Sequence, residues 1–202
     1  MVAVIDYGAG NLRSVMSALR SVGCDARVAE SAADIARARA MILPGVGAAA
    51  DTMENLRSRG LADVIVDWIR ADRPFMGICM GLQVLFTESE EGGGQDCLGV
   101  IPGRVTRLPQ GEKVPHMGWN QVHYTRDIAL FDGIPEGSDF YFVHSFVAEP
   151  TDRSVIAAET EYGVRFCSAV ATGNLVATQF HPEKSGPMGL RVYANFLRDA
   201  LQ

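Results

Sequence analysis

The feature that most constrains the fold is a regular alternation of short apolar runs with helical patterns over the first 88 residues. Each apolar run has the length of a buried strand, and apolar residues between the runs recur at the spacing of one helix face. Strands that alternate with helices pair in parallel, with helices on both faces of the sheet. The pattern predicts strands at 1–6, 26–29, 40–43 and 74–78, and helices at 12–22, 31–39, 50–58, 61–71 and 80–86.

The second half of the chain has a different pattern, in which strand-like segments are separated by Gly, Pro, Asp and Asn turns. Residues 171–174 (ATGN) are typical of a hairpin turn, and a last helix is expected at 186–201. We therefore predict an α/β fold with a mostly parallel or mixed central sheet, flanked by helices and more antiparallel in its second half. A length of 202 residues favours a single domain spanning 1–202. The strand-like segments are 103–108, 120–125, 140–146, 154–160, 165–172 and 175–180.

Composition excludes several classes of protein. The net charge is −6, with 18 Lys and Arg and no basic run, so we expect no nucleic-acid partner. No apolar stretch approaches the roughly 18 residues that span a bilayer, and the N-terminus is predicted to be a strand instead of a signal peptide. The four cysteines form no CxxC pair, which favours free thiols and a cytoplasmic location.

The segment 77–81, GICMG, has the form of a nucleophile elbow, in which a nucleophile lies on a sharp turn between a strand and a helix. Glycines on both sides of Cys79 leave room for that turn. The helix N-terminus also favours the thiolate, which is the reactive form of cysteine. The competing interpretation is a buried structural cysteine between two incidental glycines.

A thiol nucleophile needs a base and a group that orients the base. His181 precedes Pro182, which favours an extended backbone, so Glu183 should point to the same side as the imidazole. A carboxylate in that position can hold the histidine tautomer, as in a catalytic triad. The other histidines lack such a carboxylate, and we expect them to be structural or to line the substrate site: His116, His123 and His144.

Acyl transfer also needs N–H groups aimed at the developing oxyanion. One candidate is the backbone N–H of Met80, and the other is the turn formed by Gly45, Val46 and Gly47 after the third strand. Gln83 lies four residues after Cys79, which places it on the same helix face near the substrate. An ordinary strand-to-helix turn and an exposed glutamine are the alternatives for these two features.

In this order, the segments PGVG at 44–47, GICMG at 77–81 and HPE at 181–183 resemble the class I (triad) glutamine amidotransferases over nearly the whole chain. Further segments resemble the branch of that family that serves histidine biosynthesis as glutaminase subunits of imidazole glycerol phosphate synthase. These segments are DYGAGN at 6–11, PHMGWN at 115–120, YFVHSF at 141–146 and Lys184.

The resemblance implies that Cys79 attacks the amide carbon of L-glutamine and forms a thioester. His181, oriented by Glu183, would protonate the leaving ammonia and then activate water. Family precedent places Gly47 and Gln83 on the glutamine and assigns Ser145 to its α-groups. No metal or cofactor is implied.

The resemblance also implies a partner, a cyclase subunit of (β/α)₈-barrel fold that forms a heterodimer with this chain. The cyclase would use the ammonia to make imidazole glycerol phosphate and an aminoimidazole carboxamide ribotide. Asn11, Trp119 and Lys184 would lie at the interface. The free subunit would be a poor glutaminase, because the 45–47 peptide would not point its N–H at the oxyanion until the partner binds its substrate.

Two other hypotheses remain open at this stage. One is a glutaminase subunit of another synthase, in pyridoxal phosphate, anthranilate or purine synthesis. The other is a non-catalytic binding module on the same fold, against which the intact Cys79, His181 and Glu183 set argues. A metal hydrolase has almost no support, because no HExxH or paired Cys/His spacing is present.

Overall fold

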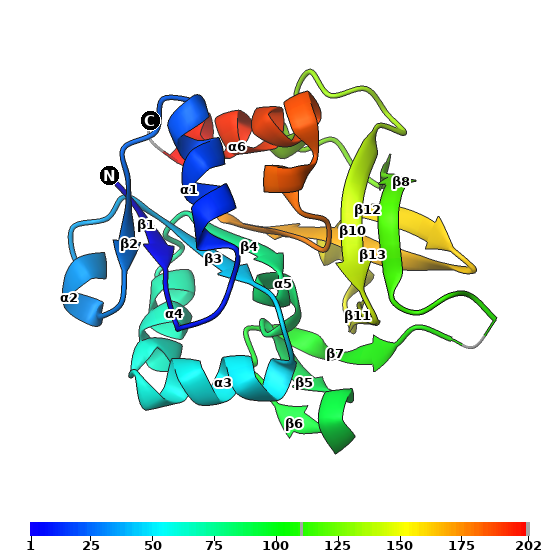
Figure 1. The fold of residues 1–202 in the computed structure, drawn as a ribbon, viewed down its shortest axis with the longest axis horizontal. Helices are drawn as coiled ribbons and strands as arrows, with labels where there is room; N and C mark the ends of the chain where they lie inside the picture. Colours follow the sequence, from blue (N-terminus) through cyan, green and yellow to red (C-terminus); the bar gives the residue numbers. More distant parts are fainter. Residues whose placement is uncertain (110, 201–202) are drawn as a thin grey trace.

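One large sheet runs through the molecule, with helices on both of its faces (Figure 1). The structure is a computed structural model that describes residues 1–109 and 111–200. Five neighbouring strands at one end of the sheet pair in parallel, in the order β2-β1-β3-β4-β14. Their bounds are β2 (Ala26–Ala29), β1 (Val2–Ile5), β3 (Ala40–Gly45), β4 (Phe75–Cys79) and β14 (Leu175–Thr178).

The sheet continues from β14 into a mainly antiparallel half, in which β5 and β7 form a parallel pair. Two further strands, β8 (His116–Gln121) and β10 (Asp139–His144), form a separate antiparallel sheet. The predicted fold class is therefore confirmed. The other strands are β13 (Val164–Thr172), β12 (Ile156–Tyr162), β11 (Phe146–Pro150), β9 (His123–Tyr124), β7 (Ile101–Arg107), β6 (Gln95–Asp96) and β5 (Phe86–Ser89).

The alternation of side chains along the parallel strands divides the core into two layers. In β1, Val2 and Val4 belong to one buried cluster, whereas Ala3 and Ile5 belong to the other. Helices α1 (Leu12–Ser21) and α6 (Gly186–Ala200) cover the first face. The second face is covered by α3 (Ala49–Ser58) and α4 (Leu61–Arg70), with α5 (Met80–Gln83) packed against β3 and β4 and α2 (Ala32–Ile35) beside β2.

Several predicted boundaries are wrong where local pattern and tertiary packing compete. The helix predicted at 80–86 ends at Gln83, because Phe86 already begins β5 and pairs with Ile101. The helix predicted at 31–39 is only α2, although its Ser31–Asp34 capping box is present as expected. A short apolar run has no period that distinguishes a helix from a strand, so pairing with a distant strand decides.

The strand-like second half is also divided differently from the prediction. Residues 140–146 form parts of two strands in different sheets, since β10 ends at His144 and β11 begins at Phe146. The segment 120–125 is likewise shared between β8 and β9. The hairpin is confirmed, with Gly173 and Asn174 joining β13 to β14, while the end of the last predicted helix at 201 lies outside the described residues. The described residues also contain four short 3-10 turns: η1 (Glu91–Gly93), η2 (Ala129–Phe131), η3 (Arg153–Val155) and η4 (Pro182–Lys184).

Close backbone packing holds α5 against the parallel strands, and two glycines make it possible. A methyl group at Gly81 would overlap the carbonyl oxygen of Leu43 in β3. A methyl group at Gly77 would meet the backbone of Gly81. Because backbone atoms cannot turn aside as a flexible side chain can, these two positions accept only glycine without moving α5 away from the sheet.

Gly81→Ala is therefore expected to lower the free energy of unfolding by about 3 kcal/mol or more, because the overlap with Leu43 forces α5 to shift. The control is Gly23→Ala, where φ is +76° but no atom lies within 4 Å of the added methyl. It should cost only about 1–2 kcal/mol of left-handed backbone strain. Urea unfolding of both variants measures the difference, and equal losses would contradict the packing argument.

Candidate active site

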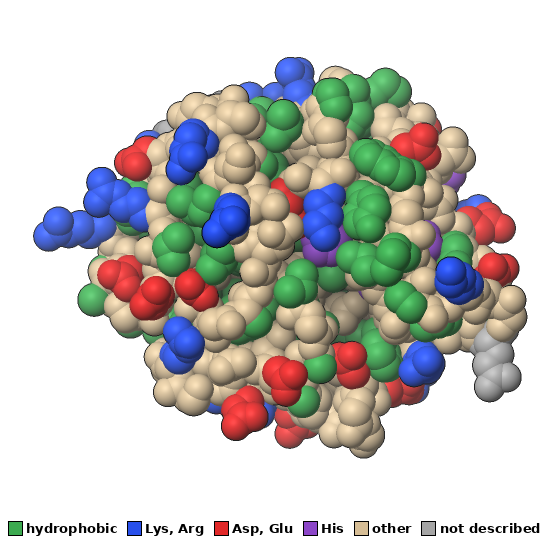
Figure 2. All heavy atoms as spheres, viewed as in Figure 1, with side chains coloured by type: hydrophobic (Ala, Val, Ile, Leu, Met, Phe, Trp, Pro, Cys, Tyr) green, Lys and Arg blue, Asp and Glu red, His purple; other side chains and the backbone are tan. Residues whose placement is uncertain are grey.

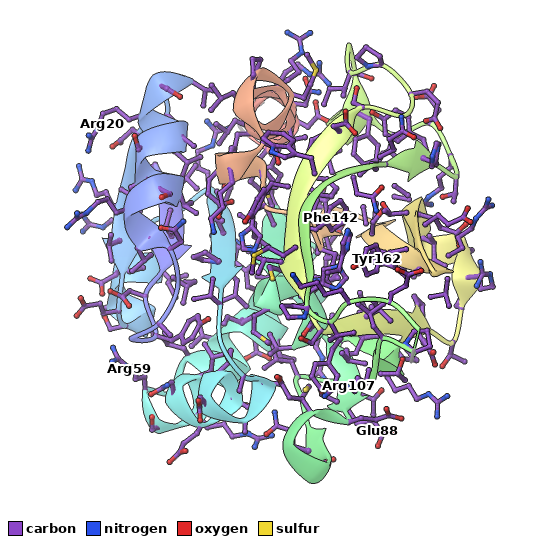
Figure 3. The ribbon with its side chains drawn as sticks, turned by 45° about the vertical axis from the view of Figure 1, so that its right-hand side comes forward. Arg20, Arg59, Glu88, Arg107, Phe142 and Tyr162 are labelled. Atoms are coloured by element: carbon purple, nitrogen blue, oxygen red, sulfur yellow. The ribbon has the colours of Figure 1, made fainter. Side chains whose placement is uncertain are left out.

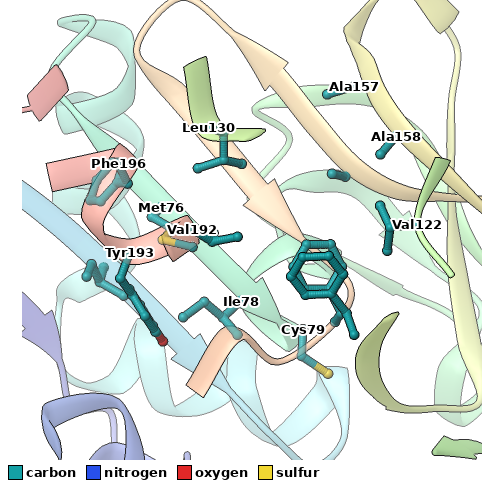
Figure 4. Close-up of a cluster of buried hydrophobic side chains, with 14 of the residues drawn as sticks. Met76, Ile78, Cys79, Val122, Leu130, Ala157, Ala158, Val192, Tyr193 and Phe196 are labelled. Carbon is teal, nitrogen blue, oxygen red and sulfur yellow. The ribbon is translucent and has the colours of Figure 1, made fainter. Parts of the chain in front are cut away.

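Cys79 lies at the end of β4 in a conformation that few non-glycine residues adopt. Its φ is +55° and its ψ is −106°, and the next residue begins α5. Figure 4 shows its sulfur directed away from the buried side chains of Met76 and Ile78 that precede it on the strand. A strained residue between a strand and a helix is typical of a nucleophile elbow. In such an elbow the reactive atom is exposed at the carboxyl end of the strand.

The sulfur faces a cavity of about 220 Å³. That volume corresponds to about seven water molecules, which suits one small amino acid. Cys79 is only 6% exposed, so a reaction there would be largely shielded from bulk water. The cavity is lined from distant parts of the chain, by Val46, Gly47, Cys79, Met80, Gln83, Glu91, Pro115, Val143, His144, Ser145, Phe146 and His181.

The predicted base and its orienting carboxylate meet in the same place. His181 Nδ1 and Glu183 Oε1 are 2.8 Å apart, and both side chains are 1% exposed. The other ring nitrogen, Nε2, is buried without a hydrogen-bond partner among the described residues. Since His181 and Cys79 line one cavity, this arrangement leaves Nε2 available to the thiol or to a bound substrate.

Electrostatics favour a protonated His181. Burial by itself would lower the pKa of the imidazole, but the charge and hydrogen-bonding capacity of Cys79, followed by those of Glu183, outweigh burial. The pKa of His181 is raised to about 10. His181 can therefore carry its proton at neutral pH beside Cys79, and a cysteine attacks a carbonyl carbon as the thiolate.

The candidate oxyanion donors lie next to Cys79. Gly45 pairs with Cys79 across β3 and β4, and a methyl group on Gly45 would come within 2.6 Å of Met80 Cβ. Val46, Gly47 and Met80 line the cavity, and Gly47 has a φ of +97°. The structure thus brings the two predicted N–H sources to one side of the sulfur. Their role as an oxyanion hole stays a prediction.

Gln83 and Ser145 also lie on the cavity wall, and their contact with glutamine stays a prediction. Gln83 Nε2 donates to the carbonyl of Phe146 and to Gln179 Oε1, both at 2.9 Å. Both of its hydrogens are used in this way. Only its oxygen is free to meet a ligand.

Glu91 is a cavity residue that the sequence reasoning missed. In the structure its Oε2 accepts a hydrogen bond from the N–H of Ala49, at the start of α3, at 2.6 Å. No local pattern signals this contact, because the two residues are 42 positions apart.

His144 lines the cavity beside His181, whereas His116 lies behind it. The centroid of the His116 ring lies 5.0 Å from that of Phe142 and 4.0 Å from that of Tyr162, and both rings stack on it. Figure 3 labels Phe142 and Tyr162. Burial lowers the pKa of His116 to about 4 and that of His144 to about 3, so both are neutral at physiological pH. His123 lies on the surface with Glu136 and takes no part in the site.

The residues predicted for a partner interface lie on the outer side of the small sheet and next to it. Trp119 is 59% exposed and Met117 is 62% exposed on β8, and both point away from buried His116. Lys184 Nζ lies 5.5 Å from the ring of Tyr141, and the Trp119 and Tyr141 rings meet edge to face. Figure 2 shows histidine side chains in the middle of this face, beside hydrophobic side chains that gather over β8 and β10. Asn11 precedes α1, which packs against η4.

Comparison with known proteins identifies the family. The family model described as glutamine amidotransferase class-I matches residues 3–200. The chain belongs to the class I glutamine amidotransferase family, as its sequence predicted.

Individual relatives within this family are similar to the chain over nearly its whole length. The chain is 52% identical, over 100% of its length and 98% of the relative, to a protein of Dehalococcoides mccartyi (strain CBDB1) named "Imidazole glycerol phosphate synthase subunit HisH". A protein of the same name from Chloroflexus aurantiacus is 51% identical, over 98% of this chain and 95% of the relative.

Among solved structures, "Crystal structure of glutamine amidotransferase" has a TM-score of 0.79 at 22% identity and covers 100% of both chains. "Structure of PurLQS from Thermotoga maritima" has a TM-score of 0.78 at 19% identity and covers 100% of this chain and 98% of that one. These two structures share the fold. Within residues 1–109 and 111–200, no helix combines the length and the apolar character that crossing a membrane requires.

Glu183→Gln tests the orienting carboxylate through the pH dependence of glutamate release. His181 must carry a proton to give to the leaving ammonia, so kcat/KM should fall as the pH rises through the pKa of about 10. Removing the charge of Glu183 lowers that pKa, and the alkaline limb should move to lower pH by about one pH unit. A pH profile between 7 and 10.5 measures this, with Glu136→Gln at surface His123 as the control. An unmoved alkaline limb would show that Glu183 does not act on His181.

Proposed function

We infer that the chain is the glutaminase subunit of imidazole glycerol phosphate synthase, in L-histidine biosynthesis. It hydrolyses L-glutamine to L-glutamate and ammonia and delivers the ammonia to a cyclase subunit. The observation that carries this proposal is the strained Cys79 facing a cavity that is also lined by His181, which is paired with the buried carboxylate of Glu183. The predicted enzyme class is confirmed by the family match, and the names of the full-length relatives support the particular pathway.

The chemistry follows from the positions of these groups. The thiolate of Cys79 attacks the γ-carbonyl carbon of glutamine, and the oxyanion accepts hydrogen bonds from the N–H of Met80 and from the 45–47 turn. His181 gives its proton to the nitrogen as the C–N bond breaks, and ammonia leaves. Neutral His181 then removes a proton from water, which attacks the thioester, releases glutamate and restores the thiolate–imidazolium pair.

The polar groups of the cavity fit the rest of a glutamine molecule. Among the described residues that line it, Glu91 is the one carboxylate, which suits it to the α-ammonium group. The free oxygen of Gln83 can accept from an ammonium or amide N–H, and Ser145 is available to the α-carboxylate. A small cavity with a few converging polar groups is the usual form of an amino-acid site.

The outer face of the small sheet is the proposed docking surface for a cyclase of (β/α)₈-barrel fold, as a heterodimer. Trp119 and Met117 form an exposed apolar pair there, and Lys184 adds a charge at its edge. Strand β10 of the same sheet supplies Val143 and His144 to the cavity wall. A partner on this face would therefore lie one sheet away from the site where ammonia forms. Asn11 would extend the contact from the start of α1.

We propose that residues 1–202 act as a single glutaminase domain that works in the cytoplasm without a cofactor. The four cysteines are free thiols, which suits a reducing compartment.

Cys79→Ala is expected to reduce glutamate release by at least about a thousandfold, because the thioester can no longer form. Synthesis by the cyclase from added ammonia should be unaffected, since that route bypasses the thioester. The assay is glutamate release by the complex with the cyclase and its nucleotide ligand, and Cys97→Ala is the matched control. Wild-type glutamate release by Cys79→Ala would remove the nucleophile assignment. Stimulation instead by the synthase subunit of another pathway would replace the histidine assignment.

Lys184→Ala should lower the stimulation of glutaminase by the cyclase more than it lowers the activity of the free chain. The reason is that Lys184 lies over Tyr141 at the edge of the docking surface and not in the cavity. Arg20→Ala is the control, because Arg20 is an exposed cation on α1, far from Phe142 and Tyr162 in Figure 3. Titration of each variant with cyclase gives the ratio, and equal stimulation of both variants would exclude an interface role for Lys184.

A further inference from the structure

The carbonyl oxygen of Phe146 anchors a chain of hydrogen bonds that leads to the nucleophile. It accepts from His144 Nδ1 at 2.9 Å and from Gln83 Nε2 at 2.9 Å. A carbonyl oxygen has two lone pairs and can only accept, so both partners must present an N–H. The orientation of the Gln83 carboxamide is therefore determined by chemistry and not by a choice between its oxygen and nitrogen.

The orientation of Gln83 determines that of Gln179. The second hydrogen of Gln83 Nε2 points at the Gln179 carboxamide, 2.9 Å away, which must offer its oxygen there. The NH₂ group of Gln179 is then turned to the sulfur of Cys79, with Nε2 3.6 Å from Sγ. Gln179 is fully buried and its backbone N–H is bonded to the carbonyl of Ser168 at 2.8 Å. It thus has no freedom to face solvent instead.

The second group that donates to the Phe146 carbonyl is His144, and the tautomers of His144 and His116 are determined in the same way. His144 donates from Nδ1, so in its neutral form Nε2 is an acceptor, and His116 must donate to it from its own Nδ1 at 2.9 Å. His116 Nε2 is then the acceptor for the amide of Asn120, at 3.2 Å. Both histidines are held neutral by burial, as this pattern requires. Every donor in this series of hydrogen bonds has an acceptor. Each group donates to the next, from the amide of Asn120 to the carbonyl of Phe146.

We propose that Gln179 is a catalytic hydrogen-bond donor to the Cys79 thiolate, and that Gln83 is a positioning residue that holds it in that orientation. This inference rests on the proposed nucleophile and adds a second group that stabilises its charged form. A buried anion needs such donors, since the cavity provides little water to solvate it. Gln179, His181 and Glu183 follow one another at intervals of two residues, so one segment carries the donor, the base and the orienting carboxylate.

The test is the rate of alkylation of Cys79 by iodoacetamide as a function of pH in the full chain, followed by mass spectrometry of the Cys79 peptide. Gln179→Met keeps the size of the side chain and removes the donor. Its alkylation midpoint should lie about one pH unit above that of the wild type, equivalent to about 1.4 kcal/mol. The titratable groups around the sulfur are His181, His144, Glu91 and Tyr7, and this substitution changes none of them.

A second variant tests the same donor role if Gln179→Met does not fold. Gln83→Met leaves Gln179 in place but removes the partner that orients it, and its midpoint should move in the same direction. The control is Asn195→Leu, which removes another buried carboxamide, bonded to the carbonyls of Leu130 and Asp132 outside the cavity. It should lower the stability of the fold while leaving the midpoint where it is.

The outcomes separate this inference from the function on which it rests. A raised midpoint in Gln179→Met, or in Gln83→Met if Gln179→Met does not fold, supports the donor role when the midpoint of Asn195→Leu is unchanged. An unchanged midpoint in folded Gln179→Met, with Cys79 still the fastest cysteine, overturns the donor role and leaves the proposed function intact. If wild-type Cys79 reacts no faster than Cys97, the nucleophile assignment and this inference both fail.

Discussion

The strained backbone at Cys79 is the constraint on which the rest of the site depends. A residue with a φ of +55° in place of glycine is unfavourable by about 1–3 kcal/mol, and it persists only where the surrounding structure leaves no alternative. Here β3 and β14 bond to β4 on both sides, and α5 packs on the carbonyl of Leu43 through Gly81. The large parallel core therefore keeps one side chain at the carboxyl end of a central strand, with its sulfur facing the cavity.

The same core brings the charged partners to that sulfur already oriented. His181 follows β14, the strand next to β4, so adjacent strand ends supply the base and the nucleophile. Glu183 is buried behind the imidazole, where an unpaired carboxylate would be costly, and its hydrogen bond to Nδ1 leaves Nε2 to the cavity. Groups that are oriented before the reaction need little reorganisation when charge develops on the substrate, which is the main source of electrostatic catalysis.

Three buried histidines within one region differ in protonation because their neighbours differ. His181 lies between a carboxylate and a thiol, and its pKa rises to about 10. His144 and His116 have aromatic rings, a carbonyl and each other as neighbours, and their pKa values fall to about 3 and 4. Burial opposes the charged form in all three, so the nearby negative groups alone make the difference for His181. One histidine can thus transfer protons while the other two serve as fixed hydrogen-bonding groups.

The sequence by itself determined the alternating α/β core, the elbow at Cys79 and the pairing of His181 with Glu183, because each depends on local spacing or on residues two to four positions apart. Tertiary structure decided what lies far apart in the chain. Phe86 belongs to a strand because it pairs with Ile101. Glu91 and Gln179 belong to the site through contacts with residues that lie 42 and 100 positions away in the sequence. Periodicity reports which face of an element is buried. Which distant group meets that face, and hence the protonation of each histidine, depends on how the whole chain packs.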